Sequence, residues 1–397
     1  MTLPATVSPE TAATLLLCGR FGPVREGANV LSPSKFNDFS HWLDTHKLSF
    51  ADLLKPDVKA ILRAYQSDPD AAEHLYLLLR RTDELDSALS HWRELGVWVV
   101  GRNDPDYPLR LRQRLKLAAF PLLFGAGPRA LLDEGGVCVV GSRDSSRQGL
   151  EFAKQLGARC GKERMTVVSS DMRGVDREAV TGALDAGGRV ICVLSDCLEK
   201  TLAGRRYRTA FDDDKLAAVT PFSPETRFKV ANAIRANKYQ YALSDVAVVV
   251  ETRQTGGVWL GADENRNEGW VPAFVHVSDT MAAGNMALLH LGLKPITIQD
   301  VDKTESLRDF FLQQGLRAGG QHKPGRGGGT LARRTTADLY SIFLAELRVL
   351  SAGRALKIAD IAAMFGIEPA QAEAWIARAV ADGAARKTAA ADAYSFN

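Results

Sequence analysis

The segment 136-GVCVVGSRDSS-146, followed by Gly149, decides the fold of this chain. Its apolar part, residues 137–140, predicts a buried parallel strand, and a helical pattern begins soon after it. The turn between them holds Gly141, Ser142 and Arg143. Glycine lets the backbone approach a ligand closely, serine can cap a helix or donate to an anion, and arginine can bind phosphate through two parallel hydrogen bonds. The segment therefore predicts a strand that ends in a phosphate-facing turn at a helix N-terminus.

The pattern around this segment predicts an α/β fold. Short runs rich in β-branched residues alternate with helical patterns, and the predicted strands are residues 97–100, 120–125, 137–140, 166–170, 190–194, 246–250 and 271–277. Such alternation is typical of a Rossmann-like parallel sheet. Ligands of such sheets lie at the carboxyl ends of the strands, near the point where the strand order reverses. We therefore expect the site where these strands end.

The chain divides into four predicted parts. Residues 1–96 show only helical patterns and predict an N-terminal helical accessory domain. Residues 97–312 form the Rossmann-like core, and residues 313–335, rich in glycine and basic side chains, predict a flexible linker. Residues 336–397 show three helical patterns and a β-wing over 384–396. That order predicts a C-terminal winged-helix domain.

Composition places the chain among ordinary soluble proteins. Its 397 residues are 46% hydrophobic and carry a net charge of +3. No apolar run reaches the roughly 20 residues of a membrane span, and the N-terminus lacks a signal-peptide pattern. The five cysteines favour reduced thiols in a cytoplasmic protein. Basic residues gather at 205–208 and 227–238, where they can follow a phosphate backbone.

Two further turns with glycine follow predicted strands. Residues 169–176 contain Ser169, Arg173 and Gly174, with Asp176 as the expected cap of the next helix, although a plain strand-to-helix connection explains this turn equally well. Residues 251–257 end in a pair of glycines, Gly256 and Gly257, which again permit close approach of the backbone to phosphate. The three turns together predict a phosphate-binding site.

Side chains near these turns are candidates for further contacts. Lys238 is a candidate for a second phosphate or base contact, and a solvated helix lysine is the competing interpretation. Trp259, beside the glycine pair, is a candidate for stacking on a base. Tyr239 and Tyr241 are weaker candidates, because aromatic residues on helices more often lie in the core. For Arg143 the alternative to phosphate binding is a surface salt bridge.

Several kinds of site are excluded by missing motifs. The chain lacks the Gly-x-Gly-x-x-Gly dinucleotide fingerprint and the Gly-Lys-Ser/Thr of a Walker A loop. Cysteine and histidine lack zinc-ligand spacing, and no acid/base pair is positioned for catalysis. We therefore expect no catalytic residues, no metal, no cofactor and no enzymatic activity.

From about Asp104 to Pro295 the residues resemble the DNA-processing protein A (Smf/DprA) family, which belongs to a wider Rossmann-like group with the LOG-type nucleotide hydrolases. Each matching piece is short, but their order and spacing are specific. The pieces are Asp104-x-x-Tyr107-Pro108, Pro121-Leu122-Leu123-Phe124-x-x-Gly127, Val140-Gly141-Ser142-Arg143-x-x-Ser146-x-x-Gly149, Val168-Ser169 with Gly174-Val175-Asp176, Ala183-Leu184 with Gly187-Gly188, residues 190–194, and Glu251 with Gly256-Gly257 and Gly261-Ala262.

The resemblance implies a protein that binds and protects single-stranded DNA and helps to load the RecA recombinase, in recombination and in DNA uptake during natural transformation. The family's DNA pocket draws on its Gly-Ser-Arg turn, so Ser142 and Arg143 carry over, and Ser146 and Gly149 shape the loop. We also expect a homodimer and no membrane contact. The predicted DNA contacts are Gly141, Ser142, Arg143, Ser146, Gly149, Ser169, Arg173, Gly174, Lys238, Gly256 and Gly257.

The chain departs from the family pattern at its second basic motif, Phe-x-x-Arg-Asn-Arg. The aligned segment, residues 228–233, has neither arginine, although Asn237-Lys238 echoes a variant of the motif. Ser170, Met172 and Val180 stand where glycine, alanine and histidine are expected. These departures indicate a divergent member.

The competing hypothesis is a nucleotide-binding sensor or a LOG-like nucleotide hydrolase, in a setting such as phage defence. Glu251 or Glu264 would then lie near the ribose. The LOG pattern Pro-Gly-Gly-x-Gly-Thr-x-x-Glu is incomplete in residues 255–264, which lack its proline and its threonine. That absence favours the DNA-binding hypothesis.

Overall fold

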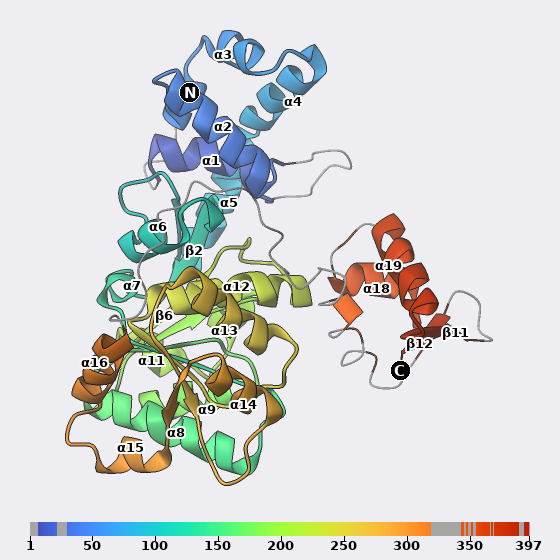
Figure 1. Cartoon of the computed structure of the whole chain (residues 1–397). Helices are drawn as coiled ribbons and strands as arrows, with labels where there is room; N and C mark the ends of the chain where they lie inside the picture. Colours follow the sequence, from blue (N-terminus) through green and yellow to red (C-terminus); the bar gives the residue numbers. More distant parts are fainter. Residues whose placement is uncertain are drawn as a thin grey trace.

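The computed structural model describes residues 7–21, 30–318, 343–344, 347, 351, 355–365, 367, 369–388 and 393–396. Helices make up the N-terminal part, as predicted (Figure 1). Serine and proline define the N-termini of the first two helices. The side chains of Ser8 and Ser32 accept hydrogen bonds from backbone N–H groups, and a proline follows each serine. The elements are α1 (Pro9–Cys18), α2 (Pro33–Thr45), the 3₁₀ helix η1 (Phe50–Leu54), α3 (Val58–Tyr65), α4 (Pro69–Leu79) and α5 (Thr82–Glu94).

A nine-stranded sheet forms the centre of the molecule, in the order β1-β2-β6-β5-β4-β3-β7-β8-β9. The strands from β6 to β9 in that order run parallel, whereas β1 and β2 are antiparallel to their neighbours. The α/β class with a mostly parallel sheet is therefore confirmed. The strands are β1 (Val97–Gly101), β2 (Leu122–Ala126), β3 (Val137–Val140), β4 (Val167–Ser169), β5 (Val190–Val193), β6 (Leu216–Thr220), β7 (Val246–Val249), β8 (Ala273–His276) and β9 (Lys294–Ile296).

Two of these strands were not predicted from the sequence. Strand β6 reads Leu-Ala-Ala-Val-Thr, and its alanines have low strand propensity. Strand β9 has Pro295 at its centre, which is tolerated because β9 is an edge strand. Pairing with the neighbouring strands, rather than local propensity, makes both of them strands.

Helices cover both faces of the sheet (Figure 1). Side chains of α8, α9, α16 and the N-terminal helices pack on one face, and those of α6, α12, α13 and α14 pack on the other. The helices are α6 (Leu109–Leu115), η2 (Lys116–Ala118), α7 (Leu131–Glu134), α8 (Arg147–Lys162), α9 (Val175–Asp185), α10 (Leu198–Ala203), α11 (Arg208–Asp212), α12 (Val230–Leu243), α13 (Gly257–Glu268), α14 (Ala283–His290), α15 (Ile298–Lys303) and α16 (Leu307–Ala318). No helix of the described residues is both long enough and apolar enough to cross a membrane.

The N-terminal helices share one hydrophobic core with the sheet. Trp92 of α5 meets Phe124 of β2 edge-on, with ring centroids 5.2 Å apart. The side chain of Asp104 accepts hydrogen bonds from Ser8 and, at 3.0 Å, from Thr11. The Asp-x-x-Tyr-Pro turn thus holds α1 against the sheet.

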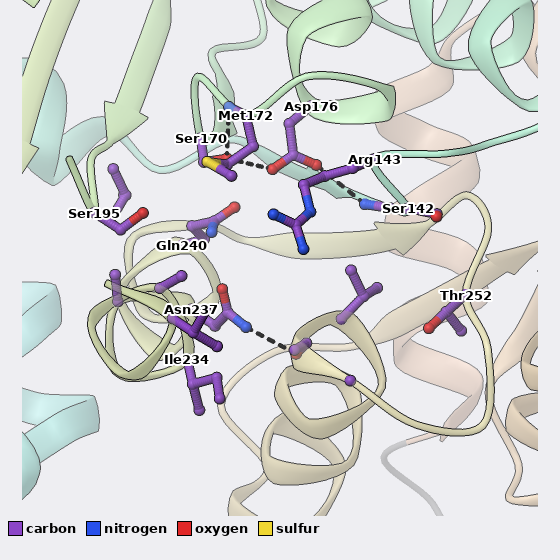
Figure 2. A pocket seen from close by; sticks show the side chains of 18 of the residues that line it. Ser142, Arg143, Ser170, Met172, Asp176, Ser195, Ile234, Asn237, Gln240 and Thr252 are labelled. Atoms are coloured by element: carbon purple, nitrogen blue, oxygen red, sulfur yellow. Dashed lines mark hydrogen bonds between the residues drawn. The ribbon is translucent and has the colours of Figure 1, made fainter. Parts of the chain in front are cut away.

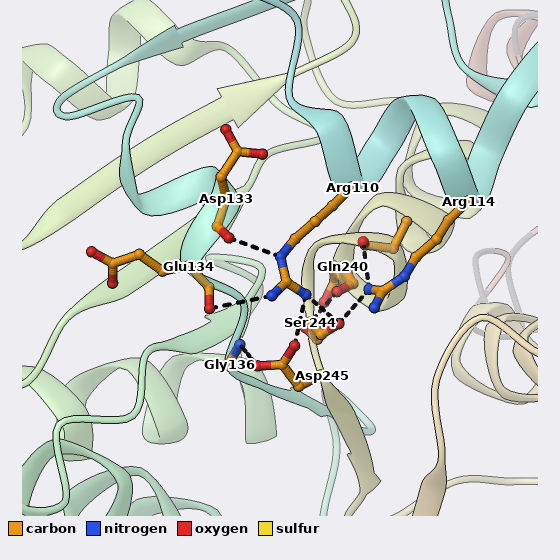
Figure 3. A network of polar contacts seen from close by, with 9 residues as sticks. Arg110, Arg114, Asp133, Glu134, Gly136, Gln240, Ser244 and Asp245 are labelled. Carbon is orange, nitrogen blue, oxygen red and sulfur yellow. Dashed lines mark hydrogen bonds and ion pairs between the residues drawn. The ribbon is translucent and has the colours of Figure 1, made fainter. Parts of the chain in front are cut away.

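Two arginines of α6 contact the edge of the sheet where strands β3 and β7 begin (Figure 3). The predicted phosphate-facing turns lie at the opposite edge, where these strands end. Arg110 donates to the Asp245 carboxylate at 2.7 Å, and that carboxylate also accepts from the N–H of Gly136 at 2.9 Å. Arg114 donates to the carbonyl oxygen of Ser244. The contacts join α6 to the segments that enter β3 and β7.

The C-terminal part has its own hydrophobic core, which includes Phe343, Ile361 and Ile376. It contains α18 (Ile358–Phe365), α19 (Pro369–Ala381) and an antiparallel sheet in the order β10-β12-β11, with β10 (Leu356–Lys357), β11 (Ala385–Lys387) and β12 (Ala393–Phe396). Residues 313–318, expected in the linker, belong to α16 instead. The rest of the predicted linker, 319–335, lies outside the described residues, as does most of the first of the three helical patterns expected in the C-terminal domain, residues 337–350.

Close contact between α8 and α9 leads to a stability prediction. A Cβ on Gly157 of α8 would overlap the backbone of Ala179 on α9. We expect Gly157→Ala to lower the free energy of unfolding by about 1–3 kcal/mol, as overpacking does. Urea denaturation measures the change.

The matched control is Gly315→Ala in α16, where a Cβ would make only ordinary contact with Pro272, at 3.6 Å. It should be neutral or stabilise by up to about 1 kcal/mol, since alanine favours helix over glycine. Equal effects of the two substitutions would contradict this account of the α8–α9 packing.

Candidate nucleic-acid interface

A pocket of about 160 Å³ lies where the strand order reverses. From β3 the chain continues through β4, β5 and β6 on one side, and then returns to β7 on the other side of β3. Parallel sheets bind ligands at such a point. Residues from the loops after β3, β4, β5 and β7, from α12 and from the start of α13 line the pocket (Figure 2).

The turn after β3 is held from both sides. The N–H of Ser142 donates to the carbonyl oxygen of Glu251 at 2.8 Å, and the N–H of Gly141 donates to the Asp176 carboxyl at 3.1 Å. A Cβ on Gly141 would overlap the side chain of Val175, so glycine is required there. The backbone of this turn is therefore fixed before any ligand binds.

Arg143 extends from this turn into the pocket (Figure 2). Its side chain is half-buried. Within the described part of the chain, no acceptor or carboxylate pairs with its guanidinium. The nearby acid, Asp144, forms an ion pair with Arg173 instead. Arg143 therefore presents an uncompensated positive charge to whatever enters the pocket.

Asp176 joins the turn after β3 to the turn after β4. It is buried, and its carboxyl accepts from the N–H of Gly141 and from the hydroxyl of Ser170. Burial raises the pKa of Asp176 to about 7, although the hydrogen bonds from Ser170 and Gly141 act in the opposite direction. We expected Asp176 to cap α9, but Gly174 occupies the N-cap position, and the Asp176 side chain reaches back to the neighbouring turn.

Glu251 ties the turn after β7 to the start of α8. One carboxylate oxygen accepts from the Ser145 hydroxyl at 2.6 Å, the Ser146 hydroxyl at 2.7 Å and the Ser146 N–H at 2.9 Å. Burial alone would raise the pKa of Glu251, but these hydrogen bonds outweigh it and lower that pKa. A Cβ on Gly149 would crowd the same oxygen. Glu251 thus positions the loop. Of the two acids that the hydrolase hypothesis offered for a contact with a ribose, Glu251 and Glu264, the first is engaged within the protein.

Residues 98–305, just over half of the chain, match the family model of DNA recombination-mediator protein A. The chain belongs to this family. The resemblance drawn from the sequence motifs is therefore confirmed.

Two kinds of relative agree with the assignment to the DNA recombination-mediator protein A family. A putative DNA processing protein DprA of Mycobacterium tuberculosis is 28% identical over 323 residues, which cover 76% of this chain and 74% of that protein. DNA processing protein A of Streptococcus pneumoniae matches 73% of this chain and 95% of its own, with 19% identity and a TM-score of 0.56. That likeness shows a shared fold.

Five of the residues predicted to contact DNA line the pocket of this DNA recombination-mediator protein A family member, namely Gly141, Ser142, Arg143, Gly256 and Gly257. Two others act on the loop. Ser146 caps α8 by accepting from the Gly149 N–H at 3.1 Å, and it also donates to Glu251. Gly174 has φ +96°, in the region that favours glycine, and lies against the backbone of the first turn.

Three predicted residues are placed away from the pocket. Ser169 is buried and donates to the carbonyl oxygen of Val139 at 2.6 Å, so its hydroxyl is not offered to a ligand. Arg173 is exposed and paired with Asp144. Lys238 lies on another side of α12, 5.9 Å from the centre of the Phe120 ring, and burial lowers its pKa. Lys238 therefore does not line this pocket, and it is not a fully solvated lysine either.

Two of the three aromatic candidates belong to the core. Tyr239 and Tyr241 are buried, and the Tyr239 hydroxyl accepts from the Phe120 N–H at 2.6 Å. Trp259 is half-buried and packs against a core cluster of β3, β7 and β8. Stacking by the two tyrosines is therefore excluded, and the core interpretation is correct.

One whole wall of the pocket, which α12 supplies, was not predicted from the sequence. Its lining residues recur at helical spacing, and they are Val230, Ala233, Ile234, Ala236, Asn237 and Gln240. Most side chains on this face are apolar, so the sequence pattern resembled that of a helix face buried in the core. The polar residues on that face, Asn237 and Gln240, were the signal that could have revealed it.

The raised pKa of Asp176 predicts a pH dependence of stability. Because the pKa is higher in the folded than in the unfolded chain, the free energy of unfolding should fall as pH rises from about 4 to about 7. Asp176→Asn keeps the shape without the titration. Relative to this variant, the original chain should lose about 2–3 kcal/mol between pH 5 and pH 8, at about 1.4 kcal/mol per pH unit. Urea denaturation at the two pH values measures it, and parallel curves for the two proteins would contradict the assignment.

Proposed function

We propose that this protein binds single-stranded DNA, with a phosphate of the strand at the Gly141–Arg143 turn. The observation that carries the proposal is the unpaired guanidinium of Arg143 in the pocket where the strand order reverses. Arginine binds phosphate oxygens with planar, charge-assisted hydrogen bonds. The fixed backbone of the turn reduces the ordering cost of such a contact. The family name, DNA recombination-mediator protein A, agrees with this proposal.

Exposed cations around the pocket support a ligand longer than one nucleotide. Arg227, Lys229, Arg235 and Arg253 are exposed, and within the described residues none of them has an ion-pair partner. Arg227 and Lys229 precede α12, Arg235 lies on α12, and Arg253 lies in the loop between β7 and α13. Unpaired cations near a groove attract a polyanion and release counterions when it binds. They provide the positive charge that the missing arginines of the second basic motif would otherwise supply.

The test is an Arg143→Ala substitution. We expect it to weaken binding of oligo-dT by tenfold or more, which is about 1.4 kcal/mol, and to reduce the dependence of affinity on salt. Fluorescence anisotropy at several salt concentrations measures both quantities. Arg63→Ala, which removes an exposed arginine of α3 outside the pocket, is the matched control and should bind as the original does. Full affinity in the Arg143→Ala protein would refute the pocket assignment.

We further propose that the protein acts as a recombination mediator, as a homodimer that helps RecA to assemble on the bound strand. The support is membership of the DNA recombination-mediator protein A family. The expected result is faster assembly of RecA on oligo-dT when the protein is present, with a sedimentation mass of two chains. Unchanged assembly kinetics with intact DNA binding would restrict the function to binding.

The C-terminal part is proposed to be a winged helix that contacts protein rather than duplex DNA. The order of α18, α19 and a three-stranded antiparallel sheet supports the winged-helix assignment. On and after α19, Glu373 and Asp382 accompany Arg378, and Arg378 lies 3.8 Å from Asp382. A recognition helix for the major groove needs free cations or amides facing the bases. Competition by duplex DNA for the bound single strand would contradict this proposal.

A further inference from the structure

A second cleft, of about 460 Å³, lies between the N-terminal helices and α6 (Figure 1). Residues of α1, α2 and η1 line one side of it, and residues of α6, of η2 and of the loop after β1 line the other. None of its lining residues belongs to the pocket where the strand order reverses. The cleft is therefore a separate feature, which the proposed strand binding does not use.

Two arginines line this cleft, and within the described residues neither has a carboxylate partner. Arg102 is only 6% exposed. Its guanidinium donates to the carbonyl oxygen of Ala119 at 2.9 Å and lies 5.0 Å from the centre of the Phe36 ring. Arg112 donates to the carbonyl oxygen of Asp104, and its Nε is buried with no hydrogen-bond partner among the described residues. Burial of an unpaired charge or donor costs free energy and calls for an explanation, and an anion in the cleft would supply one.

Lys116, at the end of α6, adds a third cation in an unusual backbone conformation. Its φ is +50° and its ψ is −123°. Residues other than glycine seldom adopt positive φ, and strain of this kind gathers at binding sites. The side chain is exposed and, in the part of the chain that the structure describes, forms no ion pair. The turn thus keeps a free ammonium group at the cleft at a cost in stability.

Two acids also line the cleft, and neither forms an ion pair with these cations within the described residues. Glu10 accepts from the N–H groups of Phe50 at 3.3 Å and of Ala51 at 2.7 Å. Asp44 is exposed. Three cations stand against two acids, one of which is already engaged by backbone N–H groups. The cleft therefore favours an anionic ligand.

The number of cations and the volume indicate which anion fits. A single guanidinium suffices for a carboxylate, whereas three cations match a phosphate group, which carries up to two charges and three terminal oxygens. The volume of about 460 Å³ is well above the roughly 150 Å³ that admits benzene, so an organic group fits beside the phosphate. Leu43, Leu48 and Phe50 supply apolar surface for that group.

We propose that this cleft binds a phosphorylated small molecule, whose phosphate contacts Arg102, Arg112 and Lys116 while its organic part packs on the apolar side chains. Because the lining comes from the N-terminal helices and from α6, the ligand holds these two parts together. A ligand that binds only the folded chain raises its stability. The inference goes beyond the proposed strand binding and does not depend on it.

Phenyl phosphate is the probe, because it joins a phosphate to one apolar ring. Calorimetric titration and thermal unfolding at constant ionic strength measure its binding to the full chain. We expect phenyl phosphate to raise the Tm and to bind at least tenfold more tightly than benzoate, which has the ring but only a carboxylate. Arg112→Gln removes one charge and should weaken phenyl phosphate binding tenfold or more. Equal affinities for the two probes would overturn the assignment to phosphate.

Lys116→Gly separates loss of binding from loss of folding. Glycine adopts positive φ without strain, so the Tm of the free protein should be unchanged or higher, while affinity for phenyl phosphate falls at least fivefold. Lys47→Gly is the matched control, because Lys47 is also an exposed lysine at positive φ, +57°, and does not line the cleft. It should bind the probe as the original does. Equal affinities of the two glycine variants would contradict the proposed role of Lys116.

Two comparisons distinguish this inference from the proposed function. Arg143→Ala should keep full affinity for phenyl phosphate, and Arg112→Gln should bind oligo-dT as the original does. Probe binding that is lost in Arg143→Ala and survives in Arg112→Gln would overturn the cleft site, because the probe then occupies the other pocket. Displacement of phenyl phosphate by oligo-dT would place the cleft on the path of the strand and overturn a separate site. Absence of any binding of phenyl phosphate would overturn the inference whether or not oligo-dT binds.

Discussion

The buried carboxyl of Asp176 is the contact on which the rest of the site depends. It connects the turn after β3 to the turn after β4, and Glu251 connects the turn after β7 to the start of α8. Three strand ends that are distant in sequence thus become one rigid edge. Both acids bind backbone N–H groups and serines, and within the described residues neither forms an ion pair with Arg143. The architecture keeps a cation unpaired in a pocket that is already organised.

Much of the fold could be predicted from the sequence, because its signals are local. The apolar run at 137–140, the glycine after it and the serine that caps α8 each encode their own conformation. Strands β6 and β9 could not be predicted, since alanine and proline carry little strand signal and only neighbouring strands define them. The sequence also predicts a separate N-terminal helical domain, whereas the N-terminal helices share a hydrophobic core with the sheet. That core depends on contacts between distant residues, such as Trp92 and Phe124.

The candidate site was predictable only in part, for a physical reason. Glycines at positive φ and a capping serine have few alternative uses, so Gly174, Gly256 and Ser146 were recognisable. The direction of a side chain depends on tertiary packing. Ser169 therefore turned out to be buried, Lys238 lies over Phe120, and Gln240 enters the pocket from a helix that looked like core. Polar residues within an apolar helical stripe mark positions where packing alone does not explain the sequence.

The central claim is that Arg143 and its turn hold a phosphate of a DNA strand. A crystal structure of the full chain with a short oligo-dT tests it most directly. The account predicts one phosphate within hydrogen-bonding distance of the Arg143 guanidinium, close to the backbone of Gly141 and Ser142. A bound strand that runs elsewhere on the surface and leaves this pocket empty would contradict it.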